Sequence, residues 1–72
     1  MAFLDNRGLE PPEPMMRVLQ ALEQLGPEEE LEVLNDRRPV FLYPLLEERG
    51  YVHETTENPD GTVRIRIRRR QG

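Results

Sequence analysis

Apolar and polar residues recur along this chain with two different periods, and each period predicts a different element. From Met15 to Leu25 the apolar residues recur every three or four positions, which predicts a helix with one apolar stripe. Over Thr62–Arg69, valine and isoleucine alternate strictly with arginine, which predicts a strand with one buried and one exposed face. Shorter patterns predict three further strands, over Ala2–Asp5, Glu30–Leu34 and Tyr51–Glu57.

Proline and glycine mark the boundaries of these elements. Gly26-Pro27 ends the first helix, and the turn sequence Asn58–Gly61 joins the last two strands into a hairpin. A second, shorter helix is predicted over Val40–Arg49, because Pro44 is tolerated only in or near the first turn of a helix. Its apolar face is predicted to contain Phe41, Leu42, Leu45 and Leu46.

The resulting order, β-α-β-α-β-β, predicts a two-layer α/β (α+β) sandwich with a four-stranded mixed sheet. Each of the first two strands is followed by a helix, so both helices are expected on one face of the sheet. The other face is expected to be open, because a sheet covered on both faces would have continuously apolar strands. Residues 1–72 are expected to form one domain, with Arg69–Gly72 as a frayed tail.

The amino-acid composition excludes several kinds of chemistry but does not identify a function. The 72 residues include no cysteine, which excludes disulfides, thiolate nucleophiles and cysteine-ligated zinc in this sequence. Every basic residue is an arginine, which we attribute to a GC-rich or thermophilic source rather than to function. No apolar run approaches the length of a membrane span and no secretory signal is visible, so a cytoplasmic protein without a membrane partner is expected.

The net charge of −4 is unevenly distributed along the chain. All 14 acidic residues lie before residue 62, whereas residues 62–72 include five arginines. Arg64, Arg66 and Arg68 would share the exposed face of the last strand, where they could contact a nucleic-acid backbone. Glu30 and Glu32 could neutralise this row, and few aromatic residues are available to stack on bases, so nucleic acid is the weaker interpretation.

The segment Leu4-Asp5-Asn6-Arg7-Gly8-Leu9-Glu10-Pro11-Pro12-Glu13-Pro14 resembles the signature of the TusA/SirA family, Leu-Asp-x-x-Gly-x-x-Cys-Pro-x-Pro. Four residues match this signature in type and spacing: Asp5, Gly8, Pro12 and Pro14. The resemblance implies the β-α-β-α-β-β fold over nearly the whole chain. In that family the cysteine lies at the N-terminus of the first helix and carries a persulfide. Pro11 stands in its place here, so this activity is not implied.

Further stretches, Glu32–Pro39, Phe41–Pro44 and Glu47–Tyr51, resemble a cysteine-lacking branch of the same superfamily that is described as a domain of unknown function. Members of that branch occur alone or fused to hemerythrin-like and iron–sulfur-repair domains. The resemblance therefore implies a context of respiratory or nitrosative-stress metabolism, without assigning a chemistry.

Two segments are the best candidates for a contact surface. Asn6–Pro14 precedes a helix N-terminus, which can attract an anion or simply form a rigid turn, although its prolines lack N–H groups. In Asn35–Pro39, the two adjacent arginines could bind a carboxylate or phosphate, or pair with neighbouring acids. Tyr43 is added because it lies off the apolar stripe of its helix and could be exposed at an interface, although packing in the core or at its edge is the favoured interpretation. The candidate contact residues are Asn6, Arg7, Glu10, Glu13, Asp36, Arg37, Arg38 and Tyr43.

The remaining polar and sulfur-containing residues do not suggest a site. His53 is the sole histidine and is expected on the surface of a strand, because a metal site needs several converging ligands. Met15 and Met16 are expected in the core rather than as metal ligands. No catalytic residue, metal ligand or cofactor is predicted.

The leading functional hypothesis is therefore a non-enzymatic accessory or protein-interaction module with a sulfur-carrier-like fold. A module that binds a small anion, a metal or haem is one alternative. Nucleic-acid binding through Arg64, Arg66 and Arg68 is another. The expected partner is a protein of unknown identity, and a homodimer is a further option because a small domain can leave a sheet edge exposed.

Overall fold

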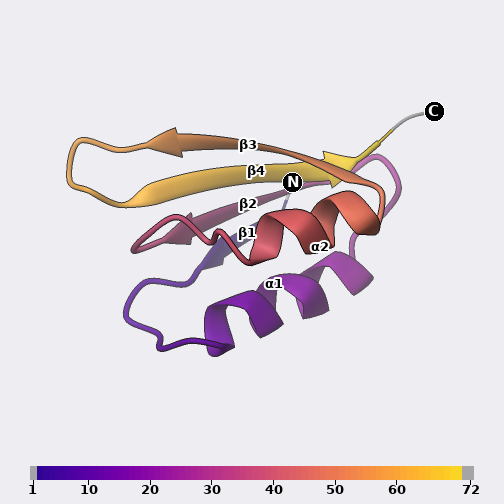
Figure 1. Cartoon of the computed structure of the whole chain (residues 1–72). Coiled ribbons are helices and arrows are strands. Elements are labelled where there is room, and N and C mark those ends of the chain that lie inside the picture. Colours follow the sequence, from indigo (N-terminus) through magenta and orange to yellow (C-terminus); the bar gives the residue numbers. More distant parts are fainter. Residues whose placement is uncertain (1, 71–72) are drawn as a thin grey trace.

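The computed structural model describes residues 2–70 of the chain. Its elements follow one another in the order predicted from the sequence (Figure 1). The strands are β1 (Ala2–Asp5), β2 (Glu30–Asn35), β3 (Tyr51–Glu57) and β4 (Val63–Arg69), and the helices are α1 (Glu13–Glu23) and α2 (Leu42–Glu48). The predicted order of elements is therefore confirmed.

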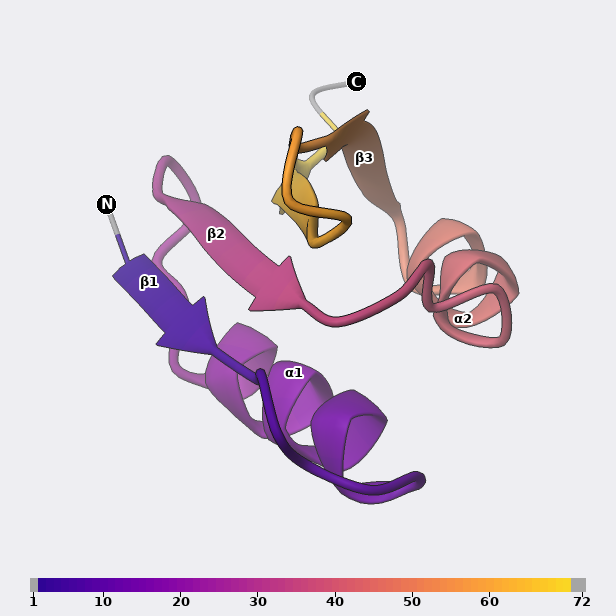
Figure 2. The same cartoon turned by 90° about the vertical axis from the view of Figure 1, so that its left-hand side faces the viewer.

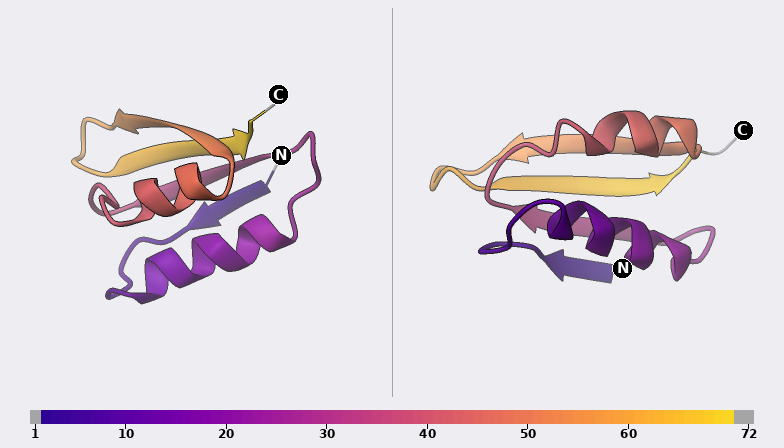
Figure 3. Two further views of the ribbon diagram at one scale, coloured as in Figure 1. Left: turned by 45° about the vertical axis from the view of Figure 1, so that its right-hand side comes forward. Right: turned by 60° about the horizontal axis from the view of Figure 1, so that its bottom comes forward.

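The four strands form one mixed sheet in the order β1-β2-β4-β3. β1 and β2 are parallel, whereas β4 runs antiparallel to both of its neighbours. The two helices lie on the same face of this sheet, as Figure 3 shows from two directions. The predicted two-layer α+β fold is thus confirmed, and the other face of the sheet is left open.

The core lies between the helices and the inward-facing residues of the sheet. On β4, Val63, Ile65 and Ile67 are buried, while the arginines between them are exposed. The other core residues come from α1, β2, α2 and β3: Val18, Leu22, Leu25, Leu31, Val33, Leu42, Leu46 and Tyr51. The apolar stripe predicted for α1 and, apart from Phe41, the one predicted for α2 thereby face the core and are largely removed from water, which is the main driving force for folding. Neither described helix is long and apolar enough to cross a membrane.

Charge pairs between neighbouring strands cover the open face of the sheet. On this face Arg64 lies 3.4 Å from Glu32, and Arg66 lies 3.2 Å from Glu30. The hydrogen bond that Arg66 donates to Glu30 is the main reason why the pKa of Arg66 is raised. The predicted neutralisation of the arginine row by acids of β2 is therefore confirmed for these two arginines.

The start of α2 differs from the prediction in a way that matters for function. The helix begins at Leu42 rather than at Val40, so Pro44 falls in its first turn as expected, but Phe41 precedes the helix. Phe41 is consequently 83% exposed, and its predicted place on the buried face of the helix is wrong. A proline restricts where a helix can start only to within one turn, so the pattern did not fix this boundary.

The end of the described chain is more ordered than predicted. Arg69 is the last residue of β4 and pairs with Tyr51, and the Arg70 N–H donates to the Gly50 carbonyl at 2.8 Å. The predicted fraying from Arg69 is therefore wrong for these two residues, whereas Gln71 and Gly72 lie outside the described residues.

The methionine pair is divided between core and surface. Met15 packs against the core, as predicted, but Met16 is 53% exposed. Successive residues of a helix point about 100° apart, and here Met15 lies on the side of α1 that contacts the core, whereas Met16 points away from it.

Candidate functional site

Two loops meet at the end of the sheet where the parallel strands β1 and β2 finish. Figure 2 looks at this end of the molecule, with both arrowheads toward the viewer. The Asn6 N–H donates to the Leu34 carbonyl, which extends the β1–β2 pairing by one residue. The Gly8 N–H then donates to a carboxylate oxygen of Asp36 at 2.7 Å. The fold thus ties together the two segments that the sequence indicated as contact surfaces.

A cleft of about 530 Å³ opens between these two loops. It is lined by parts of segments 6–15 and 35–42, and most of the lining is apolar: Leu9, Pro11, Pro12, Pro14, Met15, Pro39, Val40, Phe41 and Leu42. Val40 and Phe41 are 55% and 83% exposed. Exposed apolar side chains gathered beside a cleft are typical of a binding surface.

The N-terminus of α1 borders the cleft but offers few hydrogen-bond donors to an anion. The N–H of Glu13 donates to the Glu10 carbonyl, and the N–H of Met16 donates to the Pro12 carbonyl. Three prolines without an N–H surround this helix end: Pro11, Pro12 and Pro14. Because most of the donors are absent or already used, this helix end is a poor anion site despite its favourable dipole.

Two asparagine side chains form a polar floor beneath the apolar lining. Asn6 and Asn35 are 1% and 5% exposed, and both line the cleft at the carboxyl ends of neighbouring strands. The Asn6 Nδ2 donates to the Pro14 carbonyl at 3.0 Å, which ties the end of β1 to the first turn of α1. The Oδ1 atoms of both asparagines have no hydrogen-bond partner within residues 2–70. Buried polar groups are normally paired, so these oxygens mark the place where a donor is missing.

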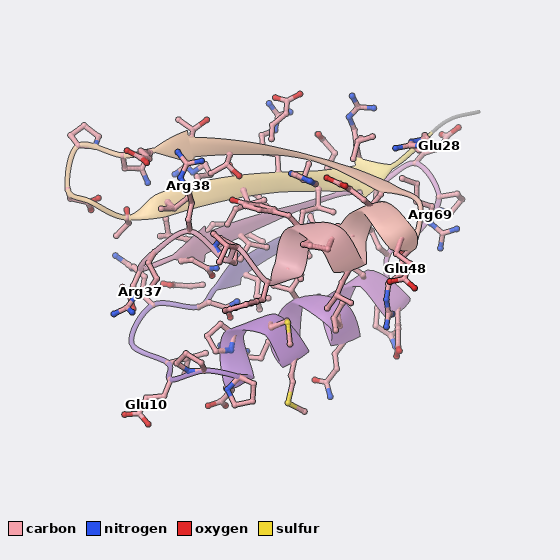
Figure 4. All side chains as sticks on the ribbon, viewed as in Figure 1. Glu10, Glu28, Arg37, Arg38, Glu48 and Arg69 are labelled. Atoms are coloured by element: carbon pink, nitrogen blue, oxygen red, sulfur yellow. The ribbon has the colours of Figure 1, made fainter. Side chains whose placement is uncertain are left out.

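Among the charged candidates, Arg37 is the cation left available at the cleft. Arg37 lines the cleft and forms no ion pair with any other described residue. Arg38 also lines the cleft, but it donates to Glu57 at 2.8 Å, and this hydrogen bond raises its pKa. In Figure 4, Arg37 and Glu10 project from this end of the molecule, whereas Arg38 lies toward the β3–β4 hairpin. Of the two predicted arginines, Arg38 is therefore held in an ion pair with Glu57, whereas Arg37 is available to contact a partner.

Arg7 and Glu13, two of the predicted contact residues, do not line the cleft. Arg7 instead forks onto Asp5, because its Nε and one terminal nitrogen donate to the two carboxylate oxygens at 3.0 and 2.9 Å. These hydrogen bonds, together with one from the Arg7 N–H, lower the pKa of Asp5 from 3.8 to about 2. The pair fixes the turn that leads from β1 into the cleft.

The Asp5–Arg7 pair predicts how this turn responds to pH. Since the folded-state pKa of about 2 lies below the ordinary value of 3.8, the pair stabilises the folded protein above about pH 4 and is lost as the pH falls through 2. Replacing Arg7 by glutamine is expected to return the Asp5 pKa toward 3.8. An NMR titration of the Asp5 carboxyl carbon measures this, and an unchanged pKa in the variant would contradict the assigned cause.

Tyr43 does not line the cleft but packs against the core, which confirms the favoured interpretation of core or edge packing. The side chain is half-buried, and its hydroxyl lies 2.7 Å from the Thr55 hydroxyl on β3. Its ring stacks on His53 with the ring centroids 4.6 Å apart. Tyr43 therefore fastens α2 to β3, a contact between elements that the helical period alone did not show.

His53 belongs to the same structural contact. Its Nε2 lies 3.2 Å from a carboxylate oxygen of Glu47 on α2, and the side chain is half-buried rather than fully exposed. Within residues 2–70, no three side chains of histidine, cysteine, aspartate or glutamate lie close enough together to hold a metal ion.

Several residues that shape the cleft were absent from the predicted set: Leu9, Asn35, Pro39, Val40 and Phe41. Phe41 could have been found, because Pro44 in the first turn is compatible with a helix that starts after Phe41. Asn35 belongs to the candidate segment Asn35–Pro39, but its burial could not be predicted, since an asparagine at the end of a strand pattern normally indicates an exposed turn.

Comparisons with known proteins agree with the fold. The family model described as an uncharacterized conserved protein (DUF2249) matches residues 3–69. The crystal structure of a SirA-like protein from Desulfitobacterium hafniense is similar with a TM-score of 0.81 and 30% sequence identity, over 93% of this chain and 95% of that chain. No curated protein matches the chain.

Proposed function

The chain belongs to the DUF2249 family of uncharacterized conserved proteins and has a SirA-like fold, and from this premise we propose that it is a non-enzymatic interaction module. Its cleft between segments 6–15 and 35–42 docks a segment of another protein. The observation that carries the proposal is the exposure of Val40 and Phe41 on the rim of an apolar cleft. Burying large apolar side chains such as these in an interface removes them from water, which lowers the free energy and favours binding.

The missing chemistry at position 11 supports binding rather than catalysis. A persulfide carrier needs a thiol, and Pro11 supplies neither a nucleophile nor an N–H group. The helix end beside it also lacks most of the donors that would stabilise a thiolate or another anion. What the fold retains at this place is a rigid apolar wall, which is suited to recognition.

The polar groups of the cleft indicate the chemistry of the docked segment. Its apolar side chain would fill the space between the proline-rich wall and Phe41. A carboxylate next to that side chain would pair with Arg37, whose guanidinium is not used by the described residues. Backbone or side-chain N–H groups of the segment would approach the polar floor formed by Asn6 and Asn35.

Site-specific photo-crosslinking in cells of the source organism tests the proposal. A photoreactive phenylalanine analogue placed at Phe41 is expected to capture one discrete partner protein. The matched control is the same analogue at Phe3, which is 57% exposed but lies on β1, on the opposite face of the sheet. Capture from Phe41 and not from Phe3 supports docking at the cleft.

Two results would overturn the proposal. Equal capture of the same protein from Phe41 and Phe3 would show that contact is not localised at the cleft. If the analogue at Phe41 captured no protein while the chain was folded, the exposed patch would not be a docking surface. Capture of a second copy of this chain would show that the cleft forms a homodimer interface instead of binding another protein.

The arginine row on the open sheet face gives less support to nucleic-acid binding. Arg64 and Arg66 are paired with Glu32 and Glu30, so binding a phosphate backbone would require these pairs to break. We therefore place the leading proposal at the cleft.

A further inference from the structure

A second cavity of about 330 Å³ lies at the opposite end of the molecule from the cleft. Three arginines contribute to its lining, Arg49, Arg69 and Arg70, together with Tyr51 and the acidic Glu23. The apolar part of the wall comes from α1. This cavity is distinct from the docking cleft and shares no lining residue with it.

The fold brings these arginines together from two distant parts of the sequence. Arg49 follows the last residue of α2, and Arg69 ends β4. Tyr51 pairs with Arg69 in the sheet, and the Arg70 N–H donates to the Gly50 carbonyl at 2.8 Å. The convergence is therefore built into the pairing of β3 with β4 and does not depend on flexible side chains alone.

The arginines of this cavity lack the acidic partners that the chain provides elsewhere. Arg7, Arg38, Arg64 and Arg66 all form ion pairs. Arg49, Arg69 and Arg70 form none with the residues that the structure describes. Three arginines and one acidic residue, Glu23, line the cavity, so positive charge is in excess there and an anion of two charges would balance it.

Arg69 is also placed in a way that leaves its donors usable. Its guanidinium carbon lies over the Tyr51 ring, 6.0 Å from the ring centroid. The side-chain hydrogen bonds that arginines donate within residues 2–70 come from Arg7, Arg17, Arg38 and Arg66, so the N–H fork of the Arg69 guanidinium remains available to oxygen atoms. A planar fork of this kind matches phosphate and carboxylate geometry.

We propose that this arginine cavity binds a compact anion of the phosphate class, held by Arg49, Arg69 and Arg70. A compact anion fits better than an extended polyanion, because acidic residues surround the arginines. Glu23 is part of the lining, and Figure 4 shows Glu28 and Glu48 at the same end of the molecule as Arg69. These carboxylates would repel the neighbouring phosphates of a nucleic-acid strand.

Calorimetric titration with inorganic pyrophosphate at low ionic strength tests the site. Charge-assisted hydrogen bonds are worth roughly 1.5–3 kcal/mol each, so Arg49→Gln and Arg70→Gln are each expected to weaken binding about tenfold or more. Both variants keep the backbone hydrogen bond from Arg70 to Gly50. Arg68→Gln is the matched control, since it removes the same charge only two residues before Arg70, but on the open sheet face. It is expected to change the affinity less than twofold.

Three outcomes would overturn the proposal. These are no pyrophosphate binding at millimolar concentration, equal weakening by Arg68→Gln and Arg70→Gln, and tighter binding of a single-stranded RNA oligonucleotide that depends on Arg64 and Arg66. Equal weakening would show that only the overall charge attracts the anion. Tighter binding of a nucleoside monophosphate than of pyrophosphate, still dependent on Arg70, supports the site and identifies phosphate esters as its ligands.

Discussion

Replacing Phe41 by alanine together with Arg37 by glutamate is expected to weaken binding of the photo-captured partner by about 30-fold or more. Truncating a central aromatic residue of an interface typically costs about 2 kcal/mol or more, and the reversed charge would repel the expected carboxylate. Both side chains are exposed, so the free energy of unfolding is expected to change by less than about 0.5 kcal/mol. Calorimetry with the purified partner, alongside urea unfolding of the variant, measures both quantities.

A control pair separates the cleft from general surface effects. Phe3→Ala with Arg68→Glu makes the same changes in size and charge on the open sheet face. This control is expected to bind the partner as the unmodified protein does. Equal loss of affinity in the two double variants would mean that the cleft does not determine recognition.

Replacing Ile65 by alanine is expected to lower the free energy of unfolding by about 2–5 kcal/mol, because the side chain is fully buried at the centre of the sheet. A chain of 72 residues has a total stability of only about 4–11 kcal/mol at typical values per residue, so this variant is expected to be partly unfolded at 37 °C. Thermal unfolding followed by circular dichroism measures the change.

Arg68→Ala provides the comparison for Ile65→Ala, since it lies on the same strand but faces solvent. Its expected effect is below about 0.5 kcal/mol. If Ile65→Ala destabilised the protein no more than Arg68→Ala, β4 would not lie at the centre of the core as described.

The fold could be predicted from the sequence because each element has a pattern that few other structures share. In β4 the alternation of isoleucine with arginine sets both the strand and its buried face, and in α1 the apolar stripe sets the helix. The signature around Asp5 and Gly8 then selected the arrangement of these elements by resemblance. The fold comparison supports this choice with a TM-score of 0.81.

The site could be predicted only in outline. Segments 6–14 and 35–39 were identified correctly as neighbours of a common surface, because both follow strands whose carboxyl ends meet at one edge of the sheet. Which side chains face the cleft depends on single-residue details, such as the start of α2 after Phe41 and the hydrogen bond between the Tyr43 and Thr55 hydroxyls. A sequence pattern does not encode contacts between residues of different elements.

Pro11 has a place in the cleft as well as in the signature of the first loop. From the sequence, Pro11 marks the loss of a reactive residue from a known frame. In the structure it is part of an apolar wall that faces Val40 and Phe41 across the cleft segments. Pro11 therefore supplies no thiol, and it forms part of the apolar lining of the cleft.

The register of the sheet also determines which end of the domain is suited for attachment to a tag, a linker or a solid support. Ala2 and Ile67 both pair with Leu31, so the first residues of β1 and the last residues of β4 lie at the same end of the sheet. The docking cleft lies at the other end, after Asp5 and Asn35. A tag, a linker or a solid support joined through either terminus would therefore leave the cleft accessible. An attachment at the carboxyl side would lie closer to the arginine cavity, which Arg69 and Arg70 help to line.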